Sequence, residues 1–326
     1  MATYNSESTI EKSLISIREQ DFDQKKIEIL VVDGNSTDKT RDIAKKYGCE
    51  IIDNPERLPE IAKMIGLRRA TGIYVSIMDS DEALVRNTIL TERYRVLVKY
   101  PYLKCLTAGL KTPSGYRPCS YYVSEVGDPF TCFVYGTYSN SMHGIVMKDS
   151  AYDKSLKCYV KNFKSDDIHP IGDCATTMDL RYIHENYSDM LNDTLTATLF
   201  EKIVTDTGYT AFVEKDDDIH YSDVKFKTYL AKLRFRIVNN IFAVDGSGYS
   251  NRAKINQRLN VRKYLFPFYT ISLILPLIDG IRMSINYKHW IFLFHPFFCF
   301  YVLLSIIVMY IEKIFGIKKE NTSYAK

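Results

Sequence analysis

Two short apolar runs near the start of the chain each end in aspartate, and this pattern restricts the possible folds more than any other feature. The run at 26–32 is followed by Asp33, and the run at 73–78 is followed by Asp79-Ser80-Asp81. Runs of this length that are rich in β-branched residues predict buried strands. The sequence therefore predicts two strands that carry acidic groups at their carboxyl ends.

The segments between these runs predict two helices and one more strand. Residues 41–47 form a helical stretch before Gly48, and residues 58–70 form another before Gly72, with a strand at 49–52 between them. Strands that alternate with helices predict an α/β fold with right-handed crossovers and a mostly parallel sheet flanked by helices. Because such sheets bind ligands at the carboxyl edge of their strands, we expect the aspartates to meet there.

The Asp79/Asp81 pair has the chemistry of a cation site. Two carboxylates one residue apart can share one hard divalent ion, Mg²⁺ or Mn²⁺, which prefers oxygen ligands and leaves positions open for phosphates. Two plainer interpretations stay open: Asp33 can start a turn before Gly34, and the pair can be a solvated loop or a helix cap. The joint placement of the acids after two strands favours a ligand site.

Three segments, in this order, resemble the family 2 glycosyltransferases, which have the GT-A fold. They are Thr3-Tyr4-Asn5-Ser6-Glu7, residues 31–38, and residues 70–72 leading into 79–81. The resemblance covers roughly the first third of the chain. It implies a nucleoside pocket lined by Thr3, Tyr4 and Glu7, a base contact from Asp33, and ribose and metal–diphosphate contacts from Asp79 and Asp81.

Two positions depart from the pattern of that family. An apolar strand normally precedes the Thr-Tyr-Asn segment, whereas only Met1 and Ala2 precede it here. Either that strand lies upstream of the given start, or it is missing and its neighbours are unpaired, which would weaken the fold. Lys63 stands where the family often has arginine, and the resemblance implies that it offers a phosphate a point charge without a planar fork.

Inverting glycosyl transfer to a hydroxyl requires a base, and the resemblance implies where it lies. The family places an acid at a helix start, then a Gly-Tyr turn, a strand and a histidine; here Asp193, the run at 195–204, Gly208-Tyr209 and His220 follow in that order. Asp193 is therefore the expected base and His220 the expected neighbour of the metal. Asp193 as a helix N-cap, Asp173 as a competing base, and His220 as a surface residue stay open.

The last third of the chain has membrane character. Residues 225–244 predict a basic amphipathic helix, which fits an anionic membrane surface or, alternatively, packs on the catalytic domain. Two apolar stretches follow at 264–281, which contains two prolines and Asp279, and at 290–311, which is long enough to cross ~30 Å of hydrocarbon. Basic residues on both outer flanks predict a transmembrane helical hairpin with both ends cytoplasmic.

These features predict four regions along the 326 residues. They are a GT-A-like nucleotide-sugar-binding domain at 1–222, a juxtamembrane segment at 223–260, two transmembrane helices at 261–313 and a cytoplasmic tail at 314–326. The net charge of +4 is modest. Seven cysteines without a Cys-x-x-Cys pair favour a reducing compartment and disfavour a disulfide framework or a zinc site.

The sequence thus predicts a metal-dependent inverting glycosyltransferase at the cytoplasmic face of the cell membrane. It would move a sugar from a nucleotide donor, expected to be UDP-linked, to a lipid-linked or surface-glycan acceptor, with no nucleic-acid partner. The single tryptophan, Trp290, lies in an apolar stretch, so the Gln-x-x-Arg-Trp motif of processive family members is missing and addition of one sugar is expected. An inactive scaffold subunit and a nucleotidyltransferase remain alternatives, although the latter usually has a Gly-rich phosphate loop.

Overall fold

The computed structural model describes most of the chain and divides it into two compact units. The described residues are 1–136, 143–148, 150–163, 176–193, 196–242 and 257–317. The first unit comprises 1–111 with 141–221, and the second comprises 112–140 with 222–326. The predicted nucleotide-sugar-binding domain at 1–222 spans the whole first unit and also residues 112–140, which cluster with the C-terminal helices.

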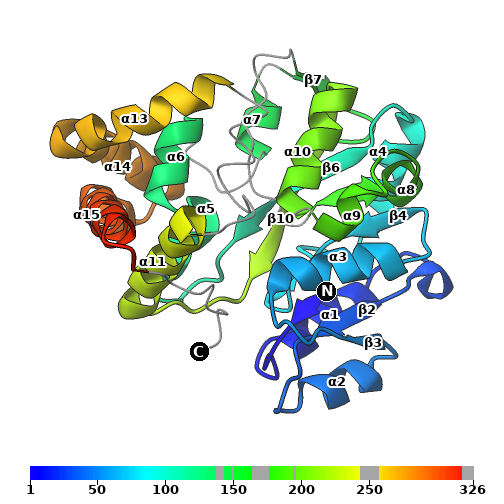
Figure 1. Ribbon diagram of the computed structural model, residues 1–326. Coiled ribbons are helices and arrows are strands. Elements are labelled where there is room, and N and C mark those ends of the chain that lie inside the picture. Colours follow the sequence, from blue (N-terminus) through cyan, green and yellow to red (C-terminus); the bar gives the residue numbers. More distant parts are fainter. Residues whose placement is uncertain (137–142, 149, 164–175, 194–195, 243–256, 318–326) are drawn as a thin grey trace. The chain divides into compact units, whose positions relative to one another are not determined.

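The first unit begins with a small parallel sheet, coloured blue in Figure 1. Its strand order is β1 (Ala2–Thr3), β2 (Leu30–Asp33) and β3 (Glu50–Asp53). The crossovers contain α1 (Ile10–Arg18) and α2 (Thr40–Lys46). The strands and the helix that the sequence predicts between residues 26 and 53 are therefore confirmed, with β2 shorter than the apolar run.

A second sheet of mixed direction makes up the rest of the β-structure. Its order is β4 (Tyr74–Ser76), β9 (Thr177–Asp179), β6 (Cys105–Lys111), β10 (Tyr209–His220), β8 (Cys158–Asn162) and β7 (Ala151–Asp153), with β5 (Glu82–Ala83) on β10. Within this sheet only β6 and β10 pair in parallel. The prediction of a mostly parallel sheet is therefore wrong here. Strand β9 starts at Thr177, which pairs with Ser76 at the carboxyl end of β4. It therefore runs antiparallel to both β4 and β6.

The two-residue strand β1 touches both sheets. The Met1 ammonium donates to the Leu30 carbonyl at 2.8 Å, and Val32 N donates to the Met1 carbonyl at 2.8 Å. On its other side Ala2 forms a parallel bridge with Asp79. The neighbours of the expected first strand are therefore paired, but only over this short stretch. Behind the bridge lies a largely apolar cavity of about 230 Å³ between the edges of β2 and β4.

Helices cover the sheets of the first unit. They are α3 (Pro59–Arg69), α4 (Ile89–Lys99), α7 (His143–Met147), α8 (Leu180–Asn186), α9 (Met190–Asp193) and α10 (Thr196–Thr207). Helix α3 starts with proline, whose fixed φ suits the first turn, and it packs on β1 and β2. The helix predicted at 58–70 is thereby confirmed.

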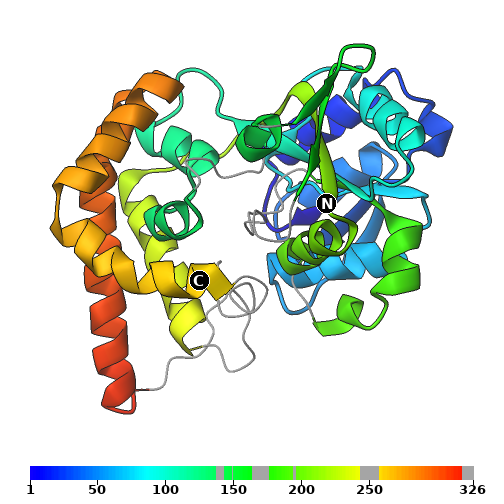
Figure 2. The ribbon, with the colours of Figure 1, turned by 90° about the horizontal axis from the view of Figure 1, so that it is seen from above.

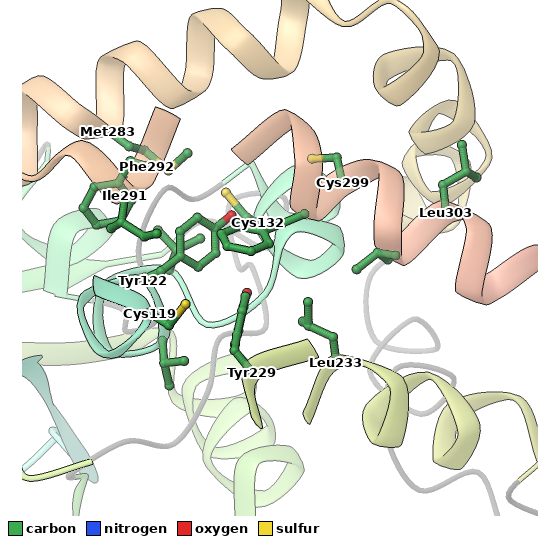
Figure 3. Close-up of a cluster of buried hydrophobic side chains, with 14 of the residues drawn as sticks. Cys119, Tyr122, Cys132, Tyr229, Leu233, Met283, Ile291, Phe292, Cys299 and Leu303 are labelled. Atoms are coloured by element: carbon green, nitrogen blue, oxygen red, sulfur yellow. The ribbon is translucent and has the colours of Figure 1, made fainter. Parts of the chain in front are cut away.

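The second unit is helical. It contains α5 (Pro118–Glu125), α6 (Pro129–Tyr135), α11 (Phe226–Phe242), α13 (Gln257–Ile271), α14 (Ile274–Tyr287), the 3₁₀ helix η2 (Trp290–Phe294) and α15 (His295–Ile314). Aromatic side chains dominate its core, among them Tyr122 of α5, Tyr229 of α11 and Phe292 of η2 (Figure 3). Both ribbon views show α11 beside α15, against which its apolar face packs (Figures 1 and 2).

The apolar C-terminal segments differ from the predicted hairpin. Residues Trp290–Ile314 form one helix that is long and apolar enough to cross a membrane. The other candidate is not straight, because Val261–Ile271 and Ile274–Tyr287 meet at an angle of 93°. Leu273 at this break has a φ of +54°, which leucine rarely adopts. The apolar face of α11 is buried within the unit, so that face is not free to lie on a membrane surface.

Candidate functional site

Strand β1 brings the two acidic strand ends of the first unit to one edge. Thr3 pairs with Asp33 of β2 on one side, and Ala2 bridges Asp79 on the other. Both contacts are parallel, so the strands end at the same rim. The convergence that the sequence pattern predicts is therefore present, and it depends on two residues of β1.

The Asp79-Ser80-Asp81 turn presents its two acids on one side and its serine on the other. Ser80 is buried; its Oγ lies 2.8 Å from Ser6 Oγ, and its carbonyl accepts a hydrogen bond from Ser13 Oγ at 3.1 Å. The side chains of Asp79 and Asp81 are 40% and 33% exposed. The contacts of Ser80 with α1 and the preceding loop thus hold the carboxylates toward solvent.

Asp81 lies next to His220. His220 Nε2 is 3.3 Å from Asp81 Oδ2, and Tyr221 N donates to the Asp81 carbonyl at 2.6 Å. The antiparallel pairing of β5 with β10 sets this contact, because Glu82 is the direct partner of His220. Two of the three predicted metal ligands therefore meet, although they are separated by 139 positions in the sequence.

The third predicted metal ligand, Asp79, is directed toward Lys63. Lys63 Nζ lies 3.5 Å from Asp79 Oδ1 and 3.6 Å from Glu60 Oε1, and its side chain is only 9% exposed. Asp79 Oδ1 is buried and has no hydrogen-bond partner among the residues that the structure describes. Lys63, which was predicted to meet a phosphate, thus lies beside the acidic turn and balances part of its charge.

Glu82 is a member of this cluster that sequence reasoning missed. Its buried carboxylate accepts a hydrogen bond from Asp79 N at 2.9 Å. Burial, together with the negative charges of Asp79 and Asp81, raises the pKa of Glu82 well above its usual value. Glu82 follows directly on Asp79-Ser80-Asp81 in the sequence, which is the one local signal for it, and it lies in β5.

Asp33 is fully buried and already paired within the protein. Ser36 donates to it from N at 3.0 Å and from Oγ at 2.5 Å, and Arg41 Nη1 contributes an ion pair at 3.0 Å. Arg41 also reaches Asp53 at 2.7 Å. A carboxylate has about four acceptor positions, so about one remains on Asp33, but its side chain has no exposure and a ligand reaches it only if this loop opens.

The segment after β1 is tied to the loop after β2. Asn5 Oδ1 accepts from Thr37 N at 2.8 Å, and Glu7 Oε2 accepts from Lys39 N at 3.1 Å. These contacts use the carboxylate of Glu7, which was predicted to line a nucleoside pocket, to fix the loop. Two other predicted pocket residues stay available. Thr3 Oγ1 is buried and, within the described ranges, has no hydrogen-bond partner. The Tyr4 ring is partly exposed and lies against Arg57.

Tyr4 and Arg57 contact each other beside this loop. The Arg57 guanidinium lies over the Tyr4 ring, 5.6 Å from its centroid, in a cation–π contact. Gly34 packs against the ring, because a Cβ at that position would lie 3.3 Å from Tyr4 Cδ2. Aromatic rings and guanidinium planes are both groups on which a planar base can stack. Arg57 is a second residue that the sequence pattern did not indicate.

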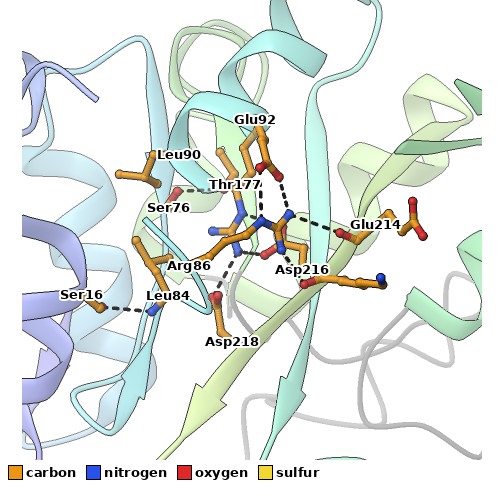
Figure 4. Close-up of polar contacts among 12 residues, drawn as sticks. Ser16, Ser76, Leu84, Arg86, Leu90, Glu92, Thr177, Glu214, Asp216 and Asp218 are labelled. Carbon is orange, nitrogen blue, oxygen red and sulfur yellow. Dashed lines mark hydrogen bonds and ion pairs between the residues drawn. The ribbon is translucent and has the colours of Figure 1, made fainter. Parts of the chain in front are cut away.

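A second charged cluster lies entirely inside the first unit (Figure 4). Figure 4 labels its two carboxylates, Asp216 and Asp218. Arg93 of α4 donates two hydrogen bonds to Asp216, at 2.8 and 2.7 Å, and one to Asp218 at 3.2 Å. All three side chains are buried. Residues 216–218 lie within β10, and the carboxylates of Asp216 and Asp218 are buried. The alternative of a surface histidine beside a solvated acidic run is therefore not favoured.

This buried cluster carries one more acid than base. Burial raises the pKa of Asp218 to about 7 and also raises that of Asp216, while the Arg93 charge opposes the shift in both. His220 follows at the same two-residue spacing along β10, so it lies on the same face of the strand. The ion pairs therefore fix the strand that delivers His220 to Asp81.

The two candidate bases are not described at the level of side chains. Asp193 is the last residue of α9, and only its backbone is described. Asp173 lies outside the described residues. Helix α9 packs on α3, and Arg68 of α3 donates to the Leu191 carbonyl at 2.6 Å. The structure thus anchors the helix that ends at Asp193.

The donor set at this edge fits a hard divalent cation only in part. Within the described ranges, no three His, Cys, Asp or Glu residues lie close enough to form a ready metal site. Asp81 and His220 supply one oxygen and one nitrogen that face each other, and the buried oxygen of Asp79 lacks a hydrogen-bond partner. Phosphate oxygens of a ligand usually complete such a site around Mg²⁺.

The part of the sequence that contains β1, Asp33 and the Asp79-Ser80-Asp81 turn is similar to known proteins. Residues 1–92 match the family described as glycosyl transferase family 2. The poly(ribitol-phosphate) beta-N-acetylglucosaminyltransferase TarS of Staphylococcus aureus is 34% identical over 93 residues, which are 27% of this chain and 16% of TarS. The GalNAc(5)-diNAcBac-PP-undecaprenol beta-1,3-glucosyltransferase of Campylobacter jejuni is 31% identical over 96 residues, 27% of this chain and 30% of that enzyme.

Solved structures resemble the whole chain more extensively. The crystal structure of S. aureus TarS 1–349 superposes with a TM-score of 0.51 and 15% identity, covering 97% of this chain and 90% of that one. The mannosyltransferase PcManGT of Pyrobaculum calidifontis, solved with GDP-Man and Mn²⁺, gives a TM-score of 0.50 and 17% identity, covering 94% and 85%. These superpositions show that the chain has a GT-A-like α/β fold.

Proposed function

We propose that the chain is a metal-dependent inverting glycosyltransferase that uses a nucleotide-sugar donor. The observation that carries this proposal is the register of β1, which places Asp33 and Asp79 on its two sides, with the Asp81–His220 pair next to them. The match of residues 1–92 to the glycosyltransferase family covers this same edge. A solved complex of TarS with UDP has the same fold, which favours UDP as the nucleotide.

Each residue at the edge takes a part of the donor. Tyr4 and Arg57 stack on the base, and Thr3 offers its buried hydroxyl. Asp81 and His220, together with Asp79, would hold Mg²⁺ or Mn²⁺. That ion, when bound, neutralises the charge that develops on the departing nucleoside diphosphate. Lys63 adds a second positive charge to the same diphosphate.

The acceptor hydroxyl gives its proton to a carboxylate, which lies on the side of the sugar opposite the departing nucleoside diphosphate. Asp193 is the proposed base and Asp173 its competitor. Substitution Asp193→Ala should lower turnover by about a hundredfold or more, which is the usual contribution of a general base. Undiminished turnover would mean either that Asp173 is the base or that the acceptor is an already ionised phosphate.

The proposed acceptor is a lipid-linked or cell-surface glycan at the cytoplasmic face of the membrane. Two facts support this part of the proposal: the apolar helix Trp290–Ile314, and the undecaprenol-linked substrate in the name of the C. jejuni relative. The chain offers no Gln-x-x-Arg-Trp motif, which favours addition of a single sugar. Vesicle flotation of the full chain tests the membrane association.

Donor hydrolysis by the purified full-length protein tests the proposed reaction. The protein is incubated with UDP-, GDP- or dTDP-sugars, with and without Mn²⁺, and the released nucleotide is identified. Metal-dependent release of a nucleoside diphosphate from one donor supports the proposal. Release of pyrophosphate would instead identify a nucleotidyltransferase, and no release from any donor, with or without acceptor lipid extract, would favour a scaffold subunit.

A further inference from the structure

A polar cavity interrupts the apolar surface of the second unit. It has a volume of about 290 Å³ and lies between α6, α13 and α14. Its polar lining consists of two arginines, one carboxylate, one tyrosine and one cysteine: Arg262, Arg282, Asp279, Tyr269 and Cys132. The remaining walls are apolar. The nucleotide-binding edge proposed above belongs to the first unit, so this cavity is a separate feature of the molecule.

Arg262 is the unusual member of this lining. Its guanidinium lies 5.3 Å from the centroid of the Phe133 ring, and within the described part of the chain it has neither an ion pair nor a hydrogen bond. An unpaired guanidinium beside apolar walls keeps its full charge and its five N–H donors. Such a group is ready to bind an anion.

Gly136 makes room for Arg262. It ends α6 with a φ of +67°, and a Cβ at this position would lie only 2.6 Å from Arg262 Nη1. Any other residue would push the guanidinium out of its place. The glycine therefore serves both the left-handed turn and the position of the arginine.

The other charges in the cavity leave a net positive charge. Asp279 is 11% exposed; its carboxylate accepts a hydrogen bond from Tyr269 Oη at 2.9 Å and lies 3.5 Å from Arg282 Nη1. Arg282, which is 65% exposed, thus offsets Asp279, and Arg262 remains as the excess charge. The donors of both arginines face the same space, which suits the several oxygens of a phosphate group.

The surface around the cavity is suited to hydrocarbon. Leu275 and Ile278 line the cavity and are exposed, and further exposed apolar side chains continue along α13 and α14 from the break between them: Leu265, Phe268, Ile271, Ile274, Leu277 and Ile281. Contiguous exposed apolar surface of this kind marks a binding site or a membrane contact. Basic pockets beside apolar helices are known sites for lipid phosphates.

We propose that this cavity binds the phosphate group of an amphiphile, with Arg262 and Arg282 as its donors and the α13–α14 surface as the path of its hydrocarbon chain. The ligand chemistry is a phosphate ester on a long alkyl or prenyl chain. It is found both in acidic phospholipids and in polyprenyl-phosphate substrates. The proposal does not depend on glycosyl transfer, because none of the residues at the nucleotide edge takes part.

Vesicle binding by the full chain tests the site. Phosphatidylcholine vesicles carry phosphatidic acid, a polyprenyl phosphate, or oleic acid as an anion without phosphorus, all adjusted to the same surface potential. The wild type should prefer either phosphate vesicle to the oleate vesicle by about tenfold, as expected for one bidentate charge-assisted contact. The higher of the two phosphate affinities identifies the source of the ligand. Equal binding to all three anions would overturn the proposal.

Three variants separate the site from general charge attraction. Arg262→Gln should abolish the preference for phosphate, whereas Lys288→Gln, which removes an exposed charge of α14's C-cap outside the cavity, should weaken binding to all anionic vesicles alike. Gly136→Ala keeps every charge and should also reduce the preference, because it displaces Arg262. Circular dichroism and the melting temperature show that each variant is folded; if Arg262→Gln is not, Arg282→Gln replaces it.

Inorganic phosphate serves as the last probe. At 10 mM it should compete only weakly with the phosphate vesicles, roughly less than twofold, because the hydrocarbon contacts are missing. Complete competition would show that the site takes free phosphate, which would overturn the proposal of an amphiphile. An unchanged phosphate preference in both Arg262→Gln and Gly136→Ala would overturn the assignment of the cavity.

Discussion

Two acidic clusters of the first unit use the same residue types and differ in their surroundings. At the sheet edge, the carboxylates of Asp79 and Asp81 are 40% and 33% exposed. Inside the unit, Asp216 and Asp218 have no exposure and share Arg93. The first arrangement is accessible to a ligand, whereas the second is enclosed and paired with a buried cation. Exposure and pairing, rather than acidity itself, separate a candidate site from a structural cluster.

The comparison predicts that changes in the two clusters affect different properties. A change at the edge should lower activity and leave the melting temperature unchanged. A change in the buried cluster should lower the melting temperature first. Asp81→Ala at the edge and Arg93→Met in the buried cluster form a matched pair that tests this division.

The largest effect is expected for Asp81→Ala. Loss of this carboxylate removes the partner of His220 and one proposed ligand of the cation. Sugar transfer or donor hydrolysis should fall by about a thousandfold, which corresponds to ~4 kcal/mol of transition-state stabilisation. Steady-state assays with Mn²⁺ measure this, and Glu185→Ala, an exposed acid of α8, is the control that should keep full activity. Activity within about threefold of wild type would remove Asp81 from the site.

The next effect is expected for Arg93→Met. This change leaves two buried carboxylates without their cation, which should lower the free energy of unfolding by about 3 kcal/mol at neutral pH. Urea unfolding followed by circular dichroism measures the loss. Because the Arg93 side chain is buried and contacts none of the proposed donor-binding side chains, the folded fraction should still bind nucleotide. A stable variant would show that the cluster contributes nothing to the fold.

A smaller, pH-dependent effect is expected for Asp218→Asn. The pKa of Asp218 in the folded state is about 7, above the unfolded value of ~3.9, so its contribution to stability is present below pH ~4 and is lost as the pH rises through about 7. Asparagine does not ionise, so the variant avoids this loss of stability. Its side-chain oxygen can still accept a hydrogen bond from Arg93. The variant should therefore be more stable than wild type by about 1–2 kcal/mol at pH 8 and equal to it near pH 4. Melting temperatures of both proteins between pH 4 and pH 8 test this prediction. A difference in stability that does not change with pH would contradict the raised pKa of Asp218.

The smallest effect concerns the cavity behind β1. Its apolar walls between β2 and β4 can accept an extended apolar chain, which would pair with both strand edges. Four added residues such as Val-Val-Ile-Val before Met1 should raise the melting temperature by ~3 °C, the scale of cavity filling in a domain of this size. An added Ser-Asn-Ser-Asn segment of equal length is the control. The same shift with both extensions would show that chain length alone acts.

The local pattern of the first eighty residues predicted much of the fold and of the site. The strands before Asp33 and Asp79, helix α3, and the meeting of acids at one rim all follow from periodicity and from the geometry of parallel strands. Such features are encoded within short windows. The direction of β9 is not, because its neighbours β4 and β6 lie about 70 to 100 positions away in the sequence.

The residues that sequence reasoning missed share a physical reason. Arg93 meets Asp216 across 123 positions, so no local pattern distinguishes it from a solvated arginine of an amphipathic helix. Arg41 and Glu82 act on acids nearby, but their roles depend on which side chains the turn buries. The break at Leu273 was partly visible, since Pro276 follows it closely, yet an apolar window alone predicted one span.

The central claim is that the edge beside β1 holds a nucleoside diphosphate together with a divalent ion. Isothermal titration of UDP into the full chain, with and without Mn²⁺, tests it most directly when wild type and His220→Ala are compared. The account predicts that Mn²⁺ tightens UDP binding by about tenfold or more in wild type and has little effect in the variant. UDP binding that ignores Mn²⁺ in wild type, or an equal response in His220→Ala, would contradict it.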